Sequence, residues 1–114
     1  MDVEYESSSA PVDSPGTLES DLGPEMYQEL RTAFLDLLPS QVDALRAASG
    51  VGDLDGAQYV AHQIKGTAPG FGATRLDELA QQVMQMDGDQ IDLLQAVVTQ
   101  IDAEVSALRN VARV

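Results

Sequence analysis

The chain contains one histidine and one lysine, His62 and Lys65, and Gly66 follows the lysine directly. Residues three or four positions apart on a helix share a face about one turn apart, so an imidazole, an ammonium and a missing side chain would meet at one spot. An imidazole is mostly neutral at pH 7 and is a nucleophile without an activating base, while a nearby cation stabilises the oxygens of a transferring phosphoryl group. The pentad from His62 to Gly66 therefore indicates phosphoryl transfer.

The segment around the pentad has the pattern of an amphipathic helix. Asp53 is the expected N-cap, and Pro69-Gly70 is the expected end. Apolar residues recur every three or four positions and predict the buried stripe: Leu54, Ala57, Ala61, Ile64 and Ala68. His62 falls on the opposite stripe, so we expect its imidazole to face solvent.

Each residue of the pentad also has an ordinary explanation. A lone histidine is most often a surface residue or a hydrogen-bonded core residue, a lysine is often a solvated charge, and Gly66 could be a C-cap. Thr67-Ala68 lets the helix continue past Gly66, however, and an interior glycine costs about 0.8 to 1 kcal/mol relative to alanine. We attribute this cost to access for a bulky partner at His62.

Partner docking requires exposed apolar side chains near the reacting residue. Tyr59 lies one turn before His62 on the same stripe, and Leu35 lies off the centre of the apolar stripe of the preceding helix. Both are predicted to be exposed docking residues, together with the open position at Gly66.

A long helix is predicted before the pentad. Gly23-Pro24 marks its start, because proline is favoured at a first helical position, and it finishes around Ser49-Gly50. Pro39 predicts a kink, or two helices nearly end to end. The apolar stripe consists of Tyr27, Leu30, Phe34, Leu37, Leu38 and Leu45.

Two more helices are predicted after the pentad. The first is ended by Asp87-Gly88-Asp89, and its stripe is Leu76, Leu79, Ala80, Val83 and Met86. The second runs to the chain end on a nearly heptad stripe: Ile91, Leu94, Val97, Val98, Ile101, Val105, Leu108 and Val111. Asp102, Glu104 and Arg109 are expected to turn away from that stripe.

These patterns predict an all-α fold with one domain. Short connections favour antiparallel neighbours, so we expect residues 18–114 to form an antiparallel up-and-down four-helix bundle. Leu18 and Leu22 indicate a short N-terminal capping helix. Residues 1–17 are rich in serine, proline and acidic side chains without a basic one, and they are predicted to be a disordered acidic tail.

Composition narrows the classes of partner. The formal net charge of −13 disfavours binding to nucleic acid and to anionic membranes. The absence of cysteine excludes thiolate metal sites, and one histidine cannot build an imidazole cluster. The acidic N-terminus is unlike a secretory signal, and no apolar run approaches the roughly 18 residues of a membrane span. We therefore expect a cytoplasmic, monomeric protein.

The pentad continues into a longer motif. His62-Gln63-Ile64-Lys65-Gly66-Thr67-Ala68 is followed by Phe71-Gly72-Ala73 and then by the leucine pair Leu76 and Leu79. This run resembles the histidine-containing phosphotransfer (HPt) domains of two-component phosphorelays, and the resemblance extends over about residues 23–114. Pro69-Gly70 departs from the small polar residues that the family often has there.

The resemblance implies a phosphocarrier without kinase activity of its own. His62 would accept a phosphoryl group from a receiver-domain aspartyl phosphate and relay it to another receiver aspartate, Lys65 would steady the phosphoryl oxygens, and Gly66 would give access. The partners would be response-regulator receiver domains or a hybrid histidine kinase, and Mg²⁺ would belong to the receiver, leaving this chain without a cofactor or metal. Family members often carry a glutamine on the next helix that reaches toward the histidine. Gln85 or Gln81 is assigned that role here, although the ungapped register falls closest to Met84.

Other readings remain open at this stage. The same motif occurs in the phosphoacceptor domain of chemotaxis-type histidine kinases. A non-catalytic helical adaptor would use the bundle surface only for docking. A metal or cofactor bundle would need inward carboxylates and further histidines, which the sequence lacks.

Overall fold

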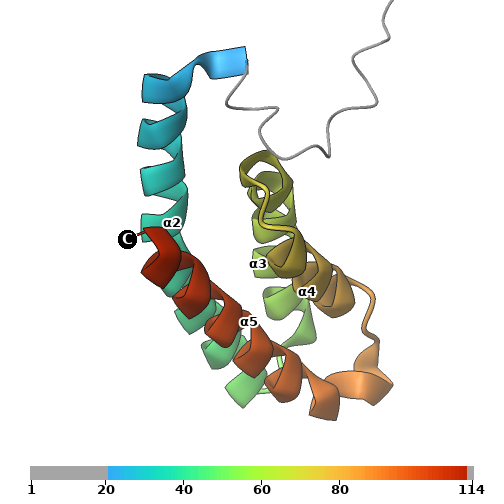
Figure 1. Ribbon diagram of the computed structural model, residues 1–114. Coiled ribbons are helices and arrows are strands. Elements are labelled where there is room, and N and C mark those ends of the chain that lie inside the picture. The colour runs from blue at the N-terminus through green and yellow to red at the C-terminus, as the bar shows by residue number, and fades with distance from the viewer. Residues whose placement is uncertain (1–20, 113–114) are drawn as a thin grey trace, which may run out of the picture.

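The computed structural model describes residues 21–112, and within that range every regular element is helical (Figure 1). The four α-helices are α2 (Pro24–Gly50), α3 (Leu54–Thr67), α4 (Thr74–Met84) and α5 (Ile91–Ala112), and two short 3₁₀ turns, η2 (Ala68–Phe71) and η3 (Gly88–Gln90), lie between them. Helix α2 packs on α3 and α5, and α4 packs on the same two helices. The predicted all-α four-helix bundle is confirmed. The predicted tail lies outside the described residues, as does Leu18 of the expected capping helix.

The core is aliphatic and lies along the central axis of the bundle. Each helix contributes part of its predicted stripe, and the large side chains that are fully buried are Leu38, Leu45, Ile64, Leu76, Leu79, Leu94, Ile101, Val83 and Val98. Alanines of α3 complete this core at the side where α3 approaches its neighbours. Small side chains there allow close helix packing, which leaves the opposite face of α3 free to carry polar residues.

Helix α2 continues through Pro39 as one element, and Figure 1 shows it bending in its middle. A proline lacks the backbone N–H that would bond to the carbonyl four residues earlier, which here is that of Leu35. Arg109 of α5 supplies the missing donor, because its Nη1 lies 2.5 Å from the Leu35 carbonyl oxygen. Arg109 Nη1 also lies 3.7 Å from an Asp36 carboxylate oxygen. The kink that the sequence predicts is therefore stabilised from a second helix.

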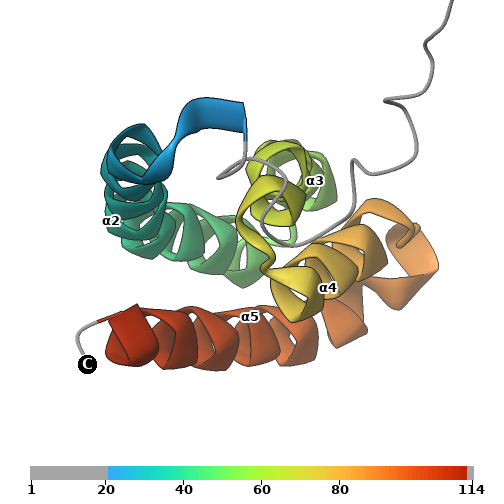
Figure 2. The same ribbon diagram turned by 45° about the horizontal axis from the view of Figure 1, so that its top comes forward.

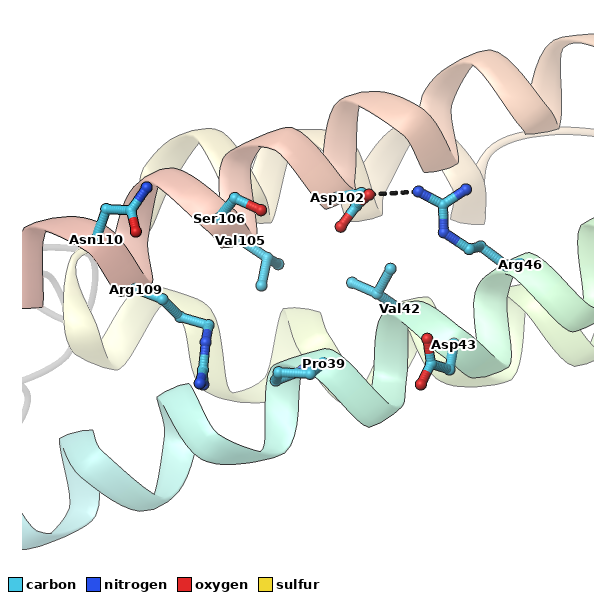
Figure 3. A pocket seen from close by; sticks show the side chains of 9 residues that line it. All are labelled: Pro39, Val42, Asp43, Arg46, Asp102, Val105, Ser106, Arg109 and Asn110. Atoms are coloured by element: carbon cyan, nitrogen blue, oxygen red, sulfur yellow. Dashed lines mark hydrogen bonds and ion pairs between the residues drawn. The ribbon is translucent and has the colours of Figure 1, made fainter.

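A second arginine connects α2 to α5. Arg46 of α2 bonds to the carboxylate of Asp102, and Figure 3 shows both side chains at the edge of a groove of about 440 Å³ between the helices. Arg109 lies further along the same groove in that view. The expectation that Asp102 and Arg109 turn away from the packing surface is wrong. Both flank the apolar stripe of α5, where a long polar side chain can still reach the facing helix.

The apolar arc of α2 is rotated from the predicted stripe. Leu35 is only 7% exposed, whereas Leu37 is 53% exposed. The prediction of an exposed Leu35 is therefore wrong, and so is the placement of Leu37 in the core stripe. Helix α2 has α5 on one side and α3 on the other, so its buried arc is wide; Leu35 lies inside that arc, while Leu37 lies at the rim that faces α3.

Candidate functional site

Helix α3 carries the candidate site, and its start is set by the predicted cap. The Asp53 carboxylate accepts a hydrogen bond from the Gly56 N–H at 3.0 Å. The helix runs from Leu54 to Thr67 and passes directly into η2 at Ala68. His62 thus lies in the third turn of a regular helix, on the exposed face opposite the buried alanines. The expectation that His62 faces solvent is confirmed.

The two glycines of α3 lie in different surroundings. A Cβ atom added at Gly56 would come within 2.3 Å of an Asp53 carboxylate oxygen, so this glycine makes room for the cap. A Cβ atom added at Gly66 would have no neighbouring atom within 4 Å. Nothing inside the molecule therefore requires glycine at position 66. The position lies one turn after His62, so the open space adjoins the imidazole, and access for a partner there stays a prediction.

Lys65 is paired with a carboxylate from the next helix. Its Nζ lies 3.3 Å from Oδ1 of Asp77, which is in the first turn of α4. The Lys65 and Asp77 side chains are 35% and 27% exposed. The ammonium therefore lies on the α4 side of His62, at a half-buried position rather than free in solvent.

Gln58 forms a second polar contact between α3 and α4. Its amide Nε2 lies 3.2, 3.2 and 2.9 Å from the carbonyl oxygens of Val83, Met84 and Met86, at the C-terminal end of α4. The carbonyls near a helix end lack some of their intrahelical donors, and of these three the Val83 oxygen also accepts the backbone N–H of Met86. Gln58 precedes His62 by one turn, and Lys65 follows it by one turn. Two polar contacts thus fix α4 against α3 on both sides of the histidine.

These contacts also set the antiparallel register of the two helices. Equal numbers of residues separate Gln58 from Lys65 on α3 and Asp77 from Met84 on α4. The residues of α4 that are level with His62 are therefore those three or four positions after Asp77. The first of them, Ala80, is buried. The second, Gln81, is half-buried and lies on the same face of α4 as Asp77.

The two candidate glutamines are separated by this geometry. Gln81 shares the α4 face of Asp77, whereas Gln85 caps the end of α4 and lines a groove toward α5 with Gln82 and Leu93. Of the two residues that the sequence leaves open, Gln81 is the one positioned beside α3. Its role toward the histidine remains a prediction.

The turn after α3 is held by an aromatic cluster. Phe71 stacks on Phe34 of α2 with ring centroids 4.7 Å apart, and Tyr27 lies 5.7 Å from Phe71. Gly72 follows with a φ of 71°, a left-handed conformation that suits glycine. The helix continues past Gly66 as predicted, but α3 ends at Thr67, and Pro69-Gly70, the predicted end, lies inside η2 before the chain turns into α4.

An exposed apolar surface borders the site on the α2 side. Tyr59 is 66% exposed, which agrees with its prediction. Leu37 lines a groove between α2 and α3 with Val60, Gln63 and Thr67, and the volume of this groove is about 380 Å³. The exposed leucine of α2 beside the α3 helix is thus Leu37 and not Leu35.

Two further kinds of feature were searched for in the described part of the chain, a metal-binding cluster and a membrane-spanning helix. Among residues 21–112, no three histidine, cysteine or acidic side chains cluster in a way that could hold a metal ion. No helix in that range is long and apolar enough to cross a membrane.

Comparison with known families agrees with the site. Residues 29–111 match the family model of the Hpt domain. The chain belongs to the Hpt domain family. It therefore has a histidine phosphotransfer role in two-component signalling, in which Hpt domains interact with receiver domains and kinases. Comparisons with curated proteins and with solved structures gave no significant match.

Three features of this Hpt domain were not found from the sequence. Gln58 and Asp77 are single polar residues that contact the neighbouring helix, and their partners are fixed only by the antiparallel register of α3 and α4. The exposure of Leu37 depends on how α2 lies between two helices. A helical wheel of one segment predicts neither the polar contacts between two helices nor an exposure that depends on two neighbouring helices. The wheel does give the faces of His62 and Tyr59, because it depends only on their own helix.

Proposed function

We propose that His62 is the phosphoacceptor of this Hpt domain and that the domain relays a phosphoryl group between receiver aspartates. The observation that carries the proposal is the open solvent face of α3, where the only histidine of the chain lies one turn from a glycine whose added Cβ would meet no atom beyond the adjacent helix backbone within 4 Å. A receiver must bring its aspartyl phosphate to the imidazole, which requires that face to be unobstructed.

The transfer step needs little from this chain beyond position and charge. The lone pair of one imidazole nitrogen forms the N–P bond, while the P–O bond to the receiver aspartate breaks and the carboxylate leaves with the bonding pair. The second ring nitrogen keeps its proton. Charge builds on the three equatorial oxygens of the phosphoryl group, and Lys65 is the cation one turn away that stabilises them. Relay to a second receiver is the reverse of this step.

The receiver docks on the exposed face around His62. Gly66 leaves space, and Tyr59 and Leu37 supply exposed apolar surface on the α2 side of α3. Leu35 is excluded from this surface by its burial. Gln81 is positioned to offer its amide from α4.

Further parts of the proposal concern the setting. The donors and acceptors are response-regulator receiver domains or a hybrid histidine kinase, and the receiver supplies Mg²⁺, so this chain carries no cofactor of its own. The domain acts as a monomer in the cytoplasm. Its strong negative charge favours receivers with a basic or neutral docking face.

The test is transfer from a panel of phosphorylated receivers to the purified chain, with detection of acid-labile, base-stable phosphate. His62→Gln should keep the melting temperature of the wild type, because the side chain is exposed, and should accept no phosphate. Gln95→Ala, at an exposed position of α5, which lies across the bundle from α3 in Figure 2, is the control and should be labelled normally. Labelling of His62→Gln would contradict the proposal, and so would a wild-type chain that no receiver labels.

A further inference from the structure

Lys65 is the only lysine of the chain, and it has one neighbour that is an anion and another that would become one on phosphorylation. On one side is His62, one turn earlier on α3. On the other side is the Asp77 carboxylate, with Nζ to Oδ1 at 3.3 Å. In the unphosphorylated domain only the carboxylate is negative, so the ammonium is held toward α4. Phosphorylation of His62 would add a second and more highly charged anion within reach of the same ammonium.

Breaking the ion pair between Lys65 and Asp77 should cost little free energy, because Asp77 has other stabilising surroundings. It lies in the first turn of α4, where the free backbone N–H groups and the helix dipole favour a negative charge. Its side chain also keeps contact with solvent. A phosphoryl group, by contrast, carries three acceptor oxygens and close to two negative charges, so it attracts an ammonium more strongly than one carboxylate does.

We propose that Asp77 is a positioning residue that competes with the phosphoryl group on His62 for the Lys65 ammonium. This inference rests on the proposed role of His62. Asp77 holds Lys65 beside the site when His62 is unmodified and weakens its hold on the phosphoryl group afterwards. The ion pair thereby limits the lifetime of phosphohistidine, which favours onward transfer over storage.

The first measurement is the lifetime of the phosphorylated chain in the absence of any receiver. Phosphoramidate phosphorylates histidine directly: an imidazole nitrogen attacks phosphorus, and the P–N bond of phosphoramidate, whose nitrogen is protonated at neutral pH, breaks with release of neutral ammonia. Asp77→Asn should lengthen the phosphohistidine lifetime about two- to fivefold, the range expected when one partly exposed ion pair stops competing.

The chain offers a matched control for charge. Glu78 is the next residue, and it pairs with Arg75 of the same helix at 3.6 Å rather than with Lys65. Glu78→Gln removes the same charge at nearly the same place, so any lengthening it causes measures the long-range field alone. The effect of Asp77→Asn should exceed that of Glu78→Gln. In a Lys65→Ala background the two substitutions should have equal, small effects on the lifetime, because the ammonium for which Asp77 and the phosphoryl group compete is then missing.

A second readout follows Lys65 itself. Labelling with ¹³C-lysine gives a single side-chain signal, because the chain has no other lysine. That signal should move on phosphorylation of the wild type, and it should move in the unphosphorylated Asp77→Asn variant but not in Glu78→Gln. A merely structural role for Asp77 would change the melting temperature without this pattern.

The outcomes separate the inference from the proposed function. Equal lifetimes for Asp77→Asn and Glu78→Gln, a shorter lifetime for Asp77→Asn, or an effect that persists without Lys65 would each overturn the inference. A lysine side-chain signal whose position is the same in Asp77→Asn as in the wild type would also overturn the inference. If no receiver labels His62 while phosphoramidate gives the expected lifetimes, the relay fails and the competition stands.

Discussion

Two helix–helix interfaces of the bundle, α2 with α5 and α3 with α4, each contain a cationic side chain that reaches from one helix to the other. The surroundings of these two cations differ. Between α2 and α5, Arg109 donates to the carbonyl that Pro39 leaves without a donor and lies beside Asp36. Between α3 and α4, Lys65 has one carboxylate partner on a helix that Gln58 already holds in place. The first cation completes the fold, whereas the second is not needed for it.

The residue types match this difference. The planar guanidinium of arginine offers several donors in fixed directions, which suits a permanent contact to a carbonyl and a carboxylate together. The ammonium of lysine is a compact charge on a flexible stem, which suits a group that exchanges one anion for another. We therefore expect substitutions on the α3–α4 side to change phosphotransfer without changing stability, and substitutions on the α2–α5 side to do the reverse.

The largest effect is expected at Gly66. Gly66→Gln should reduce receiver-dependent transfer on the order of a hundredfold, because the side chain fills the space through which the receiver approaches. The same substitution should leave the fold intact or slightly more stable, since no atom lies near the new Cβ and glutamine is the better helix former. The measurements are transfer rate, receiver affinity and melting temperature on one protein sample.

Two glycine variants control this experiment. Gly66→Ala should raise the free energy of unfolding by about 0.5 to 1 kcal/mol and retain most of the transfer. Gly56→Ala should give no such gain, because the added Cβ displaces the Asp53 cap. If Gly66→Gln binds receivers as the wild type does, Gly66 is not an access point; a joint loss of affinity and stability would mean that the backbone needs glycine there.

Arg109→Met tests the opposite side of the comparison. Removing the guanidinium leaves the Leu35 carbonyl without a partner, so the free energy of unfolding should fall by about 1 to 3 kcal/mol. Transfer to His62 should be unchanged at temperatures where the variant is folded. Urea unfolding followed by circular dichroism measures the first quantity. Arg46→Met, which breaks a more exposed pair with Asp102, should cost less than about 1 kcal/mol, and equal costs for the two would refute the special role of Arg109.

Lys65→Ala should change transfer less than Gly66→Gln does, and stability less than Arg109→Met does. The free energy of unfolding should change by less than about 1 kcal/mol, because the pair with Asp77 is partly exposed. Transfer should slow, or the phosphohistidine lifetime should shorten, by about three- to tenfold through loss of the cation at the phosphoryl oxygens. Stopped-flow transfer and the decay of labelled protein give these numbers. Unaltered kinetics would make Lys65 a solvated residue and would remove the contrast with Arg109.

A structural feature could be predicted from the sequence when it depends on one helix, and could not when it depends on how two helices pack. The Asp53 cap, the exposed His62 and the start of α2 at Pro24 are properties of single segments, and all agree with the structure. The misplaced residues are those whose surroundings come from another helix. Leu35 and Arg109 both depend on how α5 lies against α2, and periodicity within α2 or α5 does not contain that information.

Pro39 shows the same limit in another way. Its presence predicts a distortion of α2 but does not choose between one bent helix and two separate ones; in the structure α2 is one helix, and an outside donor reaches the Leu35 carbonyl. That donor comes from a residue far along the chain. Gln81 can likewise be placed nearer to α3 than Gln85 only when the contacts of Gln58 and Lys65 give the register of α3 against α4.

The packing of Tyr27 and Phe34 against Phe71 determines how far the protein can be shortened at its N-terminal side. The family match begins at residue 29, which lies inside α2, after Tyr27 and after the Gly23-Pro24 start of the helix. A chain cut to the matched range would lose one of the two rings that hold Phe71 in the turn directly behind the histidine helix. The shortest fragment that keeps this turn fully supported therefore begins no later than Gly23.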